Sequence, residues 1–256
     1  MPRGGVIWNP APRVSVKALY SAAFRAPSLN ETVLNYVPPP WVGGPSLKGN
    51  LNLSPEKVAT VDLGVSYEGR RFQAGVGFFH SKQTDNIILT DVNTAGRYVN
   101  LGQAKFHGFE AEGKYYFARN FFLMGSALYQ ANSDDAGNRN VTPIANYGAK
   151  AGVSYDSPHK FSVGLFDVHQ GPVHGYSGAL NPRPRAYDLL NSNIRYDLSR
   201  HLPPNPRTSV ALVMHADNLT NRTVWLPDWK DQPGDSIFYH RGRTIYIGVE
   251  LSLRRE

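Results

Sequence analysis

The sequence predicts an all-β fold, an antiparallel, up-and-down transmembrane β-barrel of which about eleven strands are present. Three observations predict it. Apolar and polar residues alternate along most segments, short and long connections alternate between the segments, and one face of the segments carries mainly Gly, Ser, Asn, Glu, Lys and Arg. Strands with one apolar and one polar face fit a barrel wall between lipid and a wet lumen, whereas burying the polar face in a dry core would be costly.

The ribbon from Gly108 to Ala131 shows the alternation most clearly. A polar break at residues 118–120 divides it, which predicts two antiparallel strands joined by a tight turn. Because side chains alternate between faces with a period of two, each residue can be assigned to a side. We expect lipid contact from Phe109, Tyr115, Phe121 and Tyr129. We expect Glu110, Glu112, Lys114 and Gln130 to face the lumen, with the charged residues forming a ladder of cross-strand pairs.

Four strands are predicted before this ribbon. They cover residues 6–8, 14–21 and 57–67, and a fourth that starts at Phe72 and continues toward Leu89. The ribbon itself is expected to begin upstream, near Arg97. The passage from about Arg25 to Pro55 contains runs of Pro and Gly, which predict a large loop without regular elements, and such loops often carry function.

Five further strands are predicted after the ribbon, at residues 147–155, 161–165, 190–196, 210–216 and 244–252. The turns near Asn9, Gly69, Arg119, Ser157 and Pro204 are brief, while every intervening connection is long. Short turns at one end and long loops at the other are typical of outer-membrane barrels, whereas Greek-key sandwiches mix loop lengths at both ends.

Composition excludes several kinds of binding site and membrane segment. The net charge of +7 is spread along the 256 residues, so there is no concentrated basic patch for nucleic acid. Cysteine is absent, which excludes disulfides and thiolate metal sites. No apolar run is long enough for a spanning helix, and the first ten residues lack a secretory signal, so the chain stays where it is made or its start is missing.

Several motifs carry a resemblance to a known family. The stretches Phe24 to Glu31 and Asn50 to Lys57 are followed by Tyr98 to Leu101 with Gly108 to Glu110, then Asp217 to Asn221, and finally Gly242 to Tyr246. Their order and spacing resemble the carboxy-terminal part of TonB-dependent outer-membrane receptors across essentially the whole chain. The motif residues most typical of that pattern are Phe24, Arg25, Ala26, Pro27, Asn50, Asn52, Pro55, Glu56, Asn218 and Leu219.

The resemblance implies about half of a 22-stranded barrel in the outer membrane, with residues 1–256 forming one barrel domain and the plug domain absent. The intact protein would bind and import a ferric siderophore or a similar scarce nutrient with TonB-coupled energy. Implied partners are outer-membrane lipid, the missing amino-terminal barrel half and plug, the TonB complex, and a small ligand such as a ferric chelate. No catalytic residue, resident metal or cofactor is expected.

Ligand contacts are expected in the long loops. Exposed aromatic residues beside a cation fit a planar anionic chelate, although interfacial anchoring is the alternative role. Arg25 is a candidate for ligand contact or for a structural role at the end of its strand. A haem pattern is disfavoured because no His lies between the first two motifs. The candidate ligand contacts are Arg25, His174, Tyr176, Trp225, Trp229, Tyr239 and Arg241.

Two other classes of protein remain open. A lipase-like outer-membrane barrel enzyme would need a Ser and a His from neighbouring strands on the lipid-facing surface. A soluble all-β ligand-binding module would bury Phe109, Tyr115, Phe121 and Tyr129 in a core.

Overall fold

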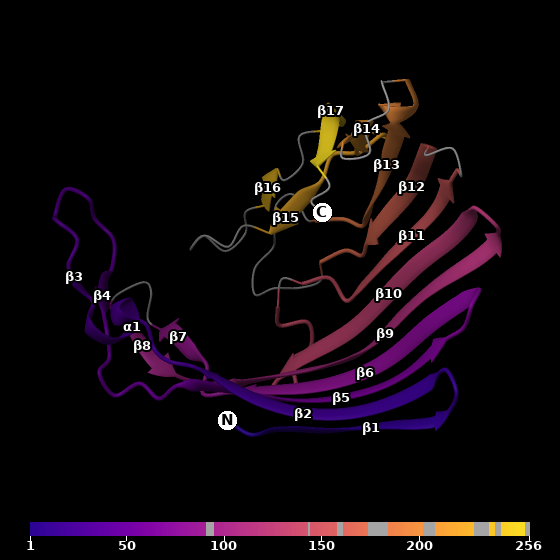
Figure 1. The fold of residues 1–256 in the computed structure, drawn as a ribbon. Coiled ribbons are helices and arrows are strands. Elements are labelled where there is room, and N and C mark those ends of the chain that lie inside the picture. The colour runs from indigo at the N-terminus through magenta and orange to yellow at the C-terminus, as the bar shows by residue number, and fades with distance from the viewer. Residues whose placement is uncertain are drawn as a thin grey trace.

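The computed structural model describes residues 1–90, 95–142, 144–157, 161–173, 184–201, 208–227, 236–238 and 242–253. Eleven strands form one antiparallel sheet in the order β1-β2-β5-β6-β9-β10-β11-β12-β13-β14-β17, so neighbours in space are also successive along the chain, apart from short strands within the loops. Figure 1 shows this sheet as a curved, open wall. The all-β, partial-barrel prediction is therefore confirmed.

The strands of the wall are long. Their bounds are β1 Arg3–Ala11, β2 Val14–Arg25, β5 Glu56–Glu68, β6 Phe72–Thr84, β9 Gln103–Ala118, β10 Phe121–Asp134, β11 Tyr147–Asp156, β12 Phe161–Gln170, β13 Tyr187–Asp197, β14 Thr208–Asp217 and β17 Thr244–Leu253. The four strands from β5 to β10 exceed the 9 to 11 residues that a tilted strand needs to cross a membrane.

The connections follow the predicted alternation. Short turns link β1 to β2, β5 to β6, and β9 to β10 at one end of the wall, and the large connections lie at the other end (Figure 1). The connection from β13 to β14 differs from the brief turn that was predicted, since it contains the 3-10 helix η1, Leu198–His201. No helix among the described residues is both long and apolar enough to cross a membrane.

The large loop between β2 and β5 corrects the sequence prediction. It contains the helix α1 (Leu29–Val33) and the short strands β3 (Asn35–Tyr36) and β4 (Ser46–Lys48). Ser28 caps α1 and Glu31 completes a capping box, so the helix start was readable as Ser-x-x-Glu. The Pro and Gly runs that suggested an irregular loop lie after this helix.

A second correction concerns residues 85–102. The strand that starts at Phe72 ends at Thr84, and β7 (Ile87–Thr90) leaves the wall to pair with β8 (Ala95–Asn100). β8 also pairs in parallel with β4, which gives a separate four-stranded sheet, β3-β4-β8-β7. Gly102, with a φ of 84°, lies between β8 and β9, so the ribbon does not run continuously from Arg97. The remaining short strands, β15 (Trp225–Pro227) and β16 (Ser236–Phe238), pair in the last loop.

The wall has no conventional hydrophobic core. The buried apolar side chains among the described residues are small, Ala104, Ala145, Val173, Ala211, Ala216 and Val224. Large apolar residues are instead exposed on the convex face, including Phe109 at 55% and Tyr129 at 54%. A soluble sheet of this composition would carry a large unprotected apolar patch.

Candidate functional site

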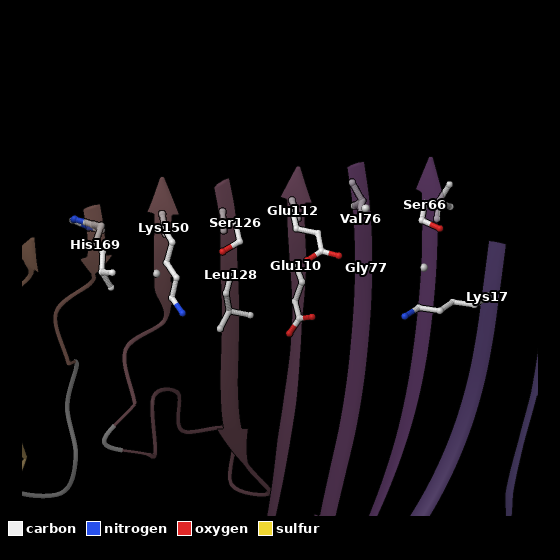
Figure 2. A pocket seen from close by; sticks show the side chains of 18 of the residues that line it. Lys17, Ser66, Val76, Gly77, Glu110, Glu112, Ser126, Leu128, Lys150 and His169 are labelled. Atoms are coloured by element: carbon white, nitrogen blue, oxygen red, sulfur yellow. The ribbon is translucent and has the colours of Figure 1, made fainter. Parts of the chain in front are cut away.

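Polar and charged side chains cluster in two regions of the wall. The first region is the concave face. A cavity of about 490 Å³ is lined by residues from β2 to β12. Figure 2 shows side chains of this lining, with Lys17 from β2, Glu110 and Glu112 from β9, and Lys150 from β11. A second cavity of about 680 Å³ extends the polar surface toward Glu68, Gln73 and Lys114.

Small residues make room for the charged side chains on this face. Gly64 lies opposite Lys17, and a Cβ at Gly64 would come within 2.6 Å of the Lys17 Cε atom. Glu112 lies between Gly75 of β6 and Ser126 of β10. The result is a polar surface with both signs of charge.

The predicted ladder of charged cross-strand pairs is wrong. Glu110 faces Gly77 and Leu128, Glu112 faces Gly75 and Ser126, and neither forms a salt bridge within the described part of the chain. The ammonium group of Lys114 instead lies over the Phe122 ring, 4.1 Å from its centroid, and over the Tyr116 ring at 4.8 Å. Cation–π contacts of this kind replace the expected ion pairs at the turn end.

The second region is the base of the large loops, where the first two sequence motifs meet. The guanidinium group of Arg25 donates from Nε to Oε2 of Glu56 at 2.5 Å, and to both carboxylate oxygens of Glu31 at 2.9 and 3.0 Å. This bidentate contact lowers the pKa of Glu31 to about 2, chiefly through the hydrogen bond from Arg25. Glu56 also accepts a hydrogen bond from the backbone N of Ile87 at 2.8 Å, which ties β7 to the same cluster.

Asparagine side chains complete the loop base. Asn50 donates from Nδ2 to the backbone O of Tyr98 at 3.0 Å, and its Oδ1 accepts from the backbone N of Asn52. Asn100 donates to the backbone O of Ser54 and accepts from the backbone N of Ser54, at 2.8 and 2.7 Å. Three stretches that are distant in sequence, around residues 25–34, 49–56 and 85–101, are thereby held together at the rim of the wall.

The fourth motif, Asp217 to Asn221, forms a similar anchor near β14. Asn218 is fully buried and has a φ of 50°, a left-handed conformation that Asn tolerates. Its side chain donates to the backbone O of Arg222 and accepts from the backbone N of Arg222, both at 2.8 Å. Asn221 accepts from the backbone N of Arg243 at 3.0 Å, which joins the start of the last loop to its end.

The structure places only part of the predicted ligand-contact set. Arg25 lies at the loop base, where Nε, Nη1 and Nη2 all bind carboxylates, and Trp225 begins β15, half-buried and opposite Phe238. His174, Tyr176, Trp229, Tyr239 and Arg241 lie outside the described residues. Their contact with a ligand, and that of Arg25 and Trp225, stays a prediction. The described residues hold no group of three or more His, Asp or Glu that could bind a metal ion.

Some members of the loop-base network were not singled out by sequence reasoning. The Ile87 amide and the carbonyl of Asp85, which accepts from Asn100 at 2.7 Å, are backbone groups without a residue-type signal. Glu31 had a signal, since it lies in the first motif and completes the capping box.

Comparison of the sequence with models of known protein families identifies the family of this chain. Residues 1–219 match the model of the family described as TonB dependent receptor-like, beta-barrel. This chain belongs to that family. The resemblance inferred from the motifs is confirmed, and the protein is an outer-membrane protein, as TonB-dependent receptors are. Family membership favours a receptor or transporter over the barrel enzyme and the soluble module.

Solved structures of TonB-dependent receptors share the fold at low sequence identity. The copper transporter OprC has a TM-score of 0.73 at 16% identity, over 98% of this chain and 39% of OprC. The FrpB iron transporter from Neisseria meningitidis has a TM-score of 0.69 at 16% identity, over 98% and 38%. The outer-membrane ferripyoverdine receptor of Pseudomonas aeruginosa has a TM-score of 0.67 at 16% identity, over 98% and 32%. This chain thus spans about two fifths or less of these receptors. No curated sequence matches it significantly.

Proposed function

We propose that this chain is the carboxy-terminal part of the barrel of an outer-membrane receptor that binds a ferric siderophore or a similar scarce nutrient and imports it with TonB-coupled energy. The observation that carries the proposal is the two-sided wall, with a polar concave face, an apolar convex face and one end at which the large loops of the described chain lie (Figure 1). Such a wall encloses a wet passage when the rest of the barrel closes it.

The two outer edges of the wall favour the proposal that the barrel is incomplete. β1 and β17 lie at the ends of the strand order, and no described strand pairs with their outer edges. Backbone groups at an open edge cannot be satisfied by lipid, so each edge requires another strand. We propose that the remaining barrel strands supply it, and that a plug inside the closed barrel couples to the TonB complex.

Residues 1–256 are proposed to form one barrel domain. The family match ends at residue 219, but β17 continues the same sheet by pairing with β14 along ten residue pairs, from Thr208 with Leu253 to Asp217 with Thr244. The last strand therefore belongs with the wall.

Ligand capture is assigned to the loops. The loop-base network holds the loops around residues 26–55 and 85–102 at the rim, where a ligand would enter. Aromatic side chains and Arg in the last loop fit a ferric catecholate or another planar anionic chelate, so Trp225, Trp229, Tyr239 and Arg241 are proposed contacts, with His174 and Tyr176 from the loop after β12.

Iron uptake tests this function. Cells that lack their own siderophore receptors should take up ⁵⁵Fe delivered as a ferric catecholate when they express the complete gene that contains this chain, and uptake should require TonB. Substituting Trp225 and Trp229 by Ala should lower uptake, while Trp8→Ala on the convex face of β1 serves as the matched control. TonB-independent uptake would refute the proposed energy coupling, and no uptake of catecholate, hydroxamate or carboxylate iron complexes would refute the ferric siderophore as the ligand.

The proposed edges can be tested separately because the chain has no cysteine. Val6 of β1 and Ile247 of β17 are 68% and 71% exposed at the two edges. A cysteine introduced at either position should react quickly with a thiol reagent in the isolated chain and slowly in the complete receptor. Equal reactivity in both settings would contradict pairing of these edges with further strands.

A further inference from the structure

The convex face of β6 and β9 carries a graded column of cross-strand pairs. From the loop end toward the turn end, the directly opposed pairs are Lys82 with Lys105, His80 with His107, Phe78 with Phe109, Val76 with Ala111, Ala74 with Gly113, and Phe72 with Tyr115. The paired rings are in contact, with centroids 6.4 Å apart for the His pair and 5.2 Å apart for the Phe pair. The column is cationic at the loop end, apolar in its middle part and aromatic at the turn end.

The Lys82 and Lys105 pair is unfavourable in the chain alone. Like charges that lie directly opposite each other destabilise a sheet. Both side chains are exposed, and neither forms a salt bridge with a described residue. Lys57, further along the same face, differs because its Nζ lies 3.3 Å from Oδ2 of Asp85. No residue in the described part of the chain therefore supplies a counterion for the lysine pair.

A cavity beside the pair adds a further cation. It has a volume of about 710 Å³ and is lined by residues that include His107, Tyr129, Ala131 and Arg139. Arg139 reaches the site through a β-bridge with Ser133, and Ser133 lies opposite Lys105 on the neighbouring strand. Lys and Arg bind phosphate well, the latter through its planar fork of donors, and an exposed imidazole can donate a further hydrogen bond.

The height of the pair on the wall matches the headgroup level of a membrane. Residues 72 to 82 span about 33 Å along a strand at about 3.3 Å per residue, which is about 23 Å across a bilayer at a tilt of about 45°. The apolar band of outer-membrane barrels is about 25 Å tall and is bordered by aromatic residues. With Phe72 and Tyr115 at the lower border, the two lysines lie at the upper border.

We propose that Lys82, Lys105, His80, His107 and Arg139 form a binding site for the phosphate groups of a phosphorylated lipid in the outer leaflet. This inference rests on the proposed contact of the convex face with lipid. A lipid fits better than a soluble anion because Phe78, Phe109 and Tyr129 continue the site downward as an apolar surface for acyl chains. The site lies on the opposite face from the lumen, so it is separate from nutrient passage.

Lipid binding by the purified protein tests the site. The protein is extracted from outer membranes in a zwitterionic detergent, and native mass spectrometry measures retention of a bis-phosphorylated glycolipid and of its dephosphorylated form. The wild type should retain the phosphorylated form preferentially. The double variant Lys82→Gln/Lys105→Gln should bind it about thirty-fold more weakly, since each Lys near an anionic lipid surface contributes about 1 kcal/mol and 1.4 kcal/mol is tenfold.

Two further variants separate binding from folding. Lys105→Glu turns the repulsive pair into an opposite-charge pair, so it should preserve or raise stability to urea while reducing retention of the bis-phosphorylated glycolipid. Arg70→Gln/Arg71→Gln removes two charges from the turn between β5 and β6, at the opposite end of β6, and should leave retention unchanged.

Each outcome decides a specific question. Equal retention of both glycolipids, or equal losses in the lysine variant and the turn control, overturns the site but leaves the membrane role intact. Full displacement by millimolar inorganic phosphate overturns the lipid assignment in favour of a soluble anion. A wild-type protein that does not partition into detergent micelles or membranes refutes the proposed function itself, and the site with it.

Discussion

Arg25 and Glu56 form the last residue pair of the β2–β5 ladder, and their side chains meet there with Nε and Oε2 2.5 Å apart. The same guanidinium group binds Glu31 of α1 through two more nitrogens, and Glu56 binds the amide of Ile87 in β7. One arginine thus links the wall to two elements of the loop region. This arrangement gives the first motif a structural role in holding the loops at the rim of the wall.

Replacing Arg25 with Gln should loosen the loop between β2 and β5 without disturbing the wall. Because the Arg25 side chain is partly exposed, we expect a local loss of about 1 to 2 kcal/mol, or roughly tenfold faster thermolysin cleavage within residues 26–55. Lys57→Gln breaks the more exposed pair with Asp85 and is the control, with little change expected. Equal cleavage rates in wild type and Arg25→Gln would contradict the structural role.

Acid should weaken the contact between Arg25 and Glu31 that holds the loop between β2 and β5. The pKa of Glu31 is lowered from 4.5 to about 2 by Arg25, so its contribution is fully present above about pH 4.5 and is lost as pH falls through about 2. Pepsin cleavage of the loop should therefore be slower in wild type than in Glu31→Gln at pH 4.5, and the two rates should converge near pH 2. Comparing both proteins at each pH removes the pH dependence of pepsin itself. A constant ratio across this range would contradict the assignment.

Gly108→Ala should destabilise the hairpin of β9 and β10. Gly108 is buried, and a Cβ there would come within 2.1 Å of the Tyr129 carbonyl oxygen and 2.7 Å of the Phe79 ring. Overpacking of this kind costs about 1 to 3 kcal/mol, which urea unfolding in micelles can measure. Gly4→Ala on β1 meets nothing within 4 Å and should be nearly neutral. Similar midpoints for both variants would count against the close approach.

Asn218 should tolerate Gly better than Ala. Both substitutions remove the side-chain hydrogen bonds with Arg222, and unsatisfied buried groups cost about 1 to 3 kcal/mol. Ala adds the strain of a φ of 50°, whereas Gly adopts that conformation freely. Thermal unfolding should rank the proteins as wild type, then Gly, then Ala. A ranking with Ala equal to Gly would show that backbone conformation is not limiting at this position.

Much of the fold was readable from the sequence because a strand has a period of two. The faces predicted for Phe109, Tyr129 and Glu112 agree with the structure, since Phe109 and Tyr129 lie opposite each other on the exposed apolar face and Glu112 lines the concave cavity. The alternation of short turns and long loops also gave the up-and-down order correctly. The motif at Asn218 was recognised as a pattern, but its hydrogen bonds required the folded chain.

The sequence predictions were wrong where the local alternation of residues suggested one set of partners and the pairing of strands in the folded chain provided another. Residues 87–90 continue an apolar strand pattern, yet they leave the wall because β8 and the carboxylate of Glu56 provide partners outside it. The charges on Glu112 and Lys114 suggested ion pairs, but register places Gly and Ser opposite Glu112, and aromatic rings near Lys114. Register between strands is fixed by the whole sheet, so these partners cannot be read from one segment.

Local alternation and connection length are enough to predict the class of fold, the side of the wall on which most residues lie, and the end that carries the loops. The folded chain was needed to show that Arg25, Glu31, Glu56 and Ile87 meet at one point, and that Lys82 faces Lys105. Those contacts join residues that are far apart in sequence, and they exist only once strand register and loop closure have been set.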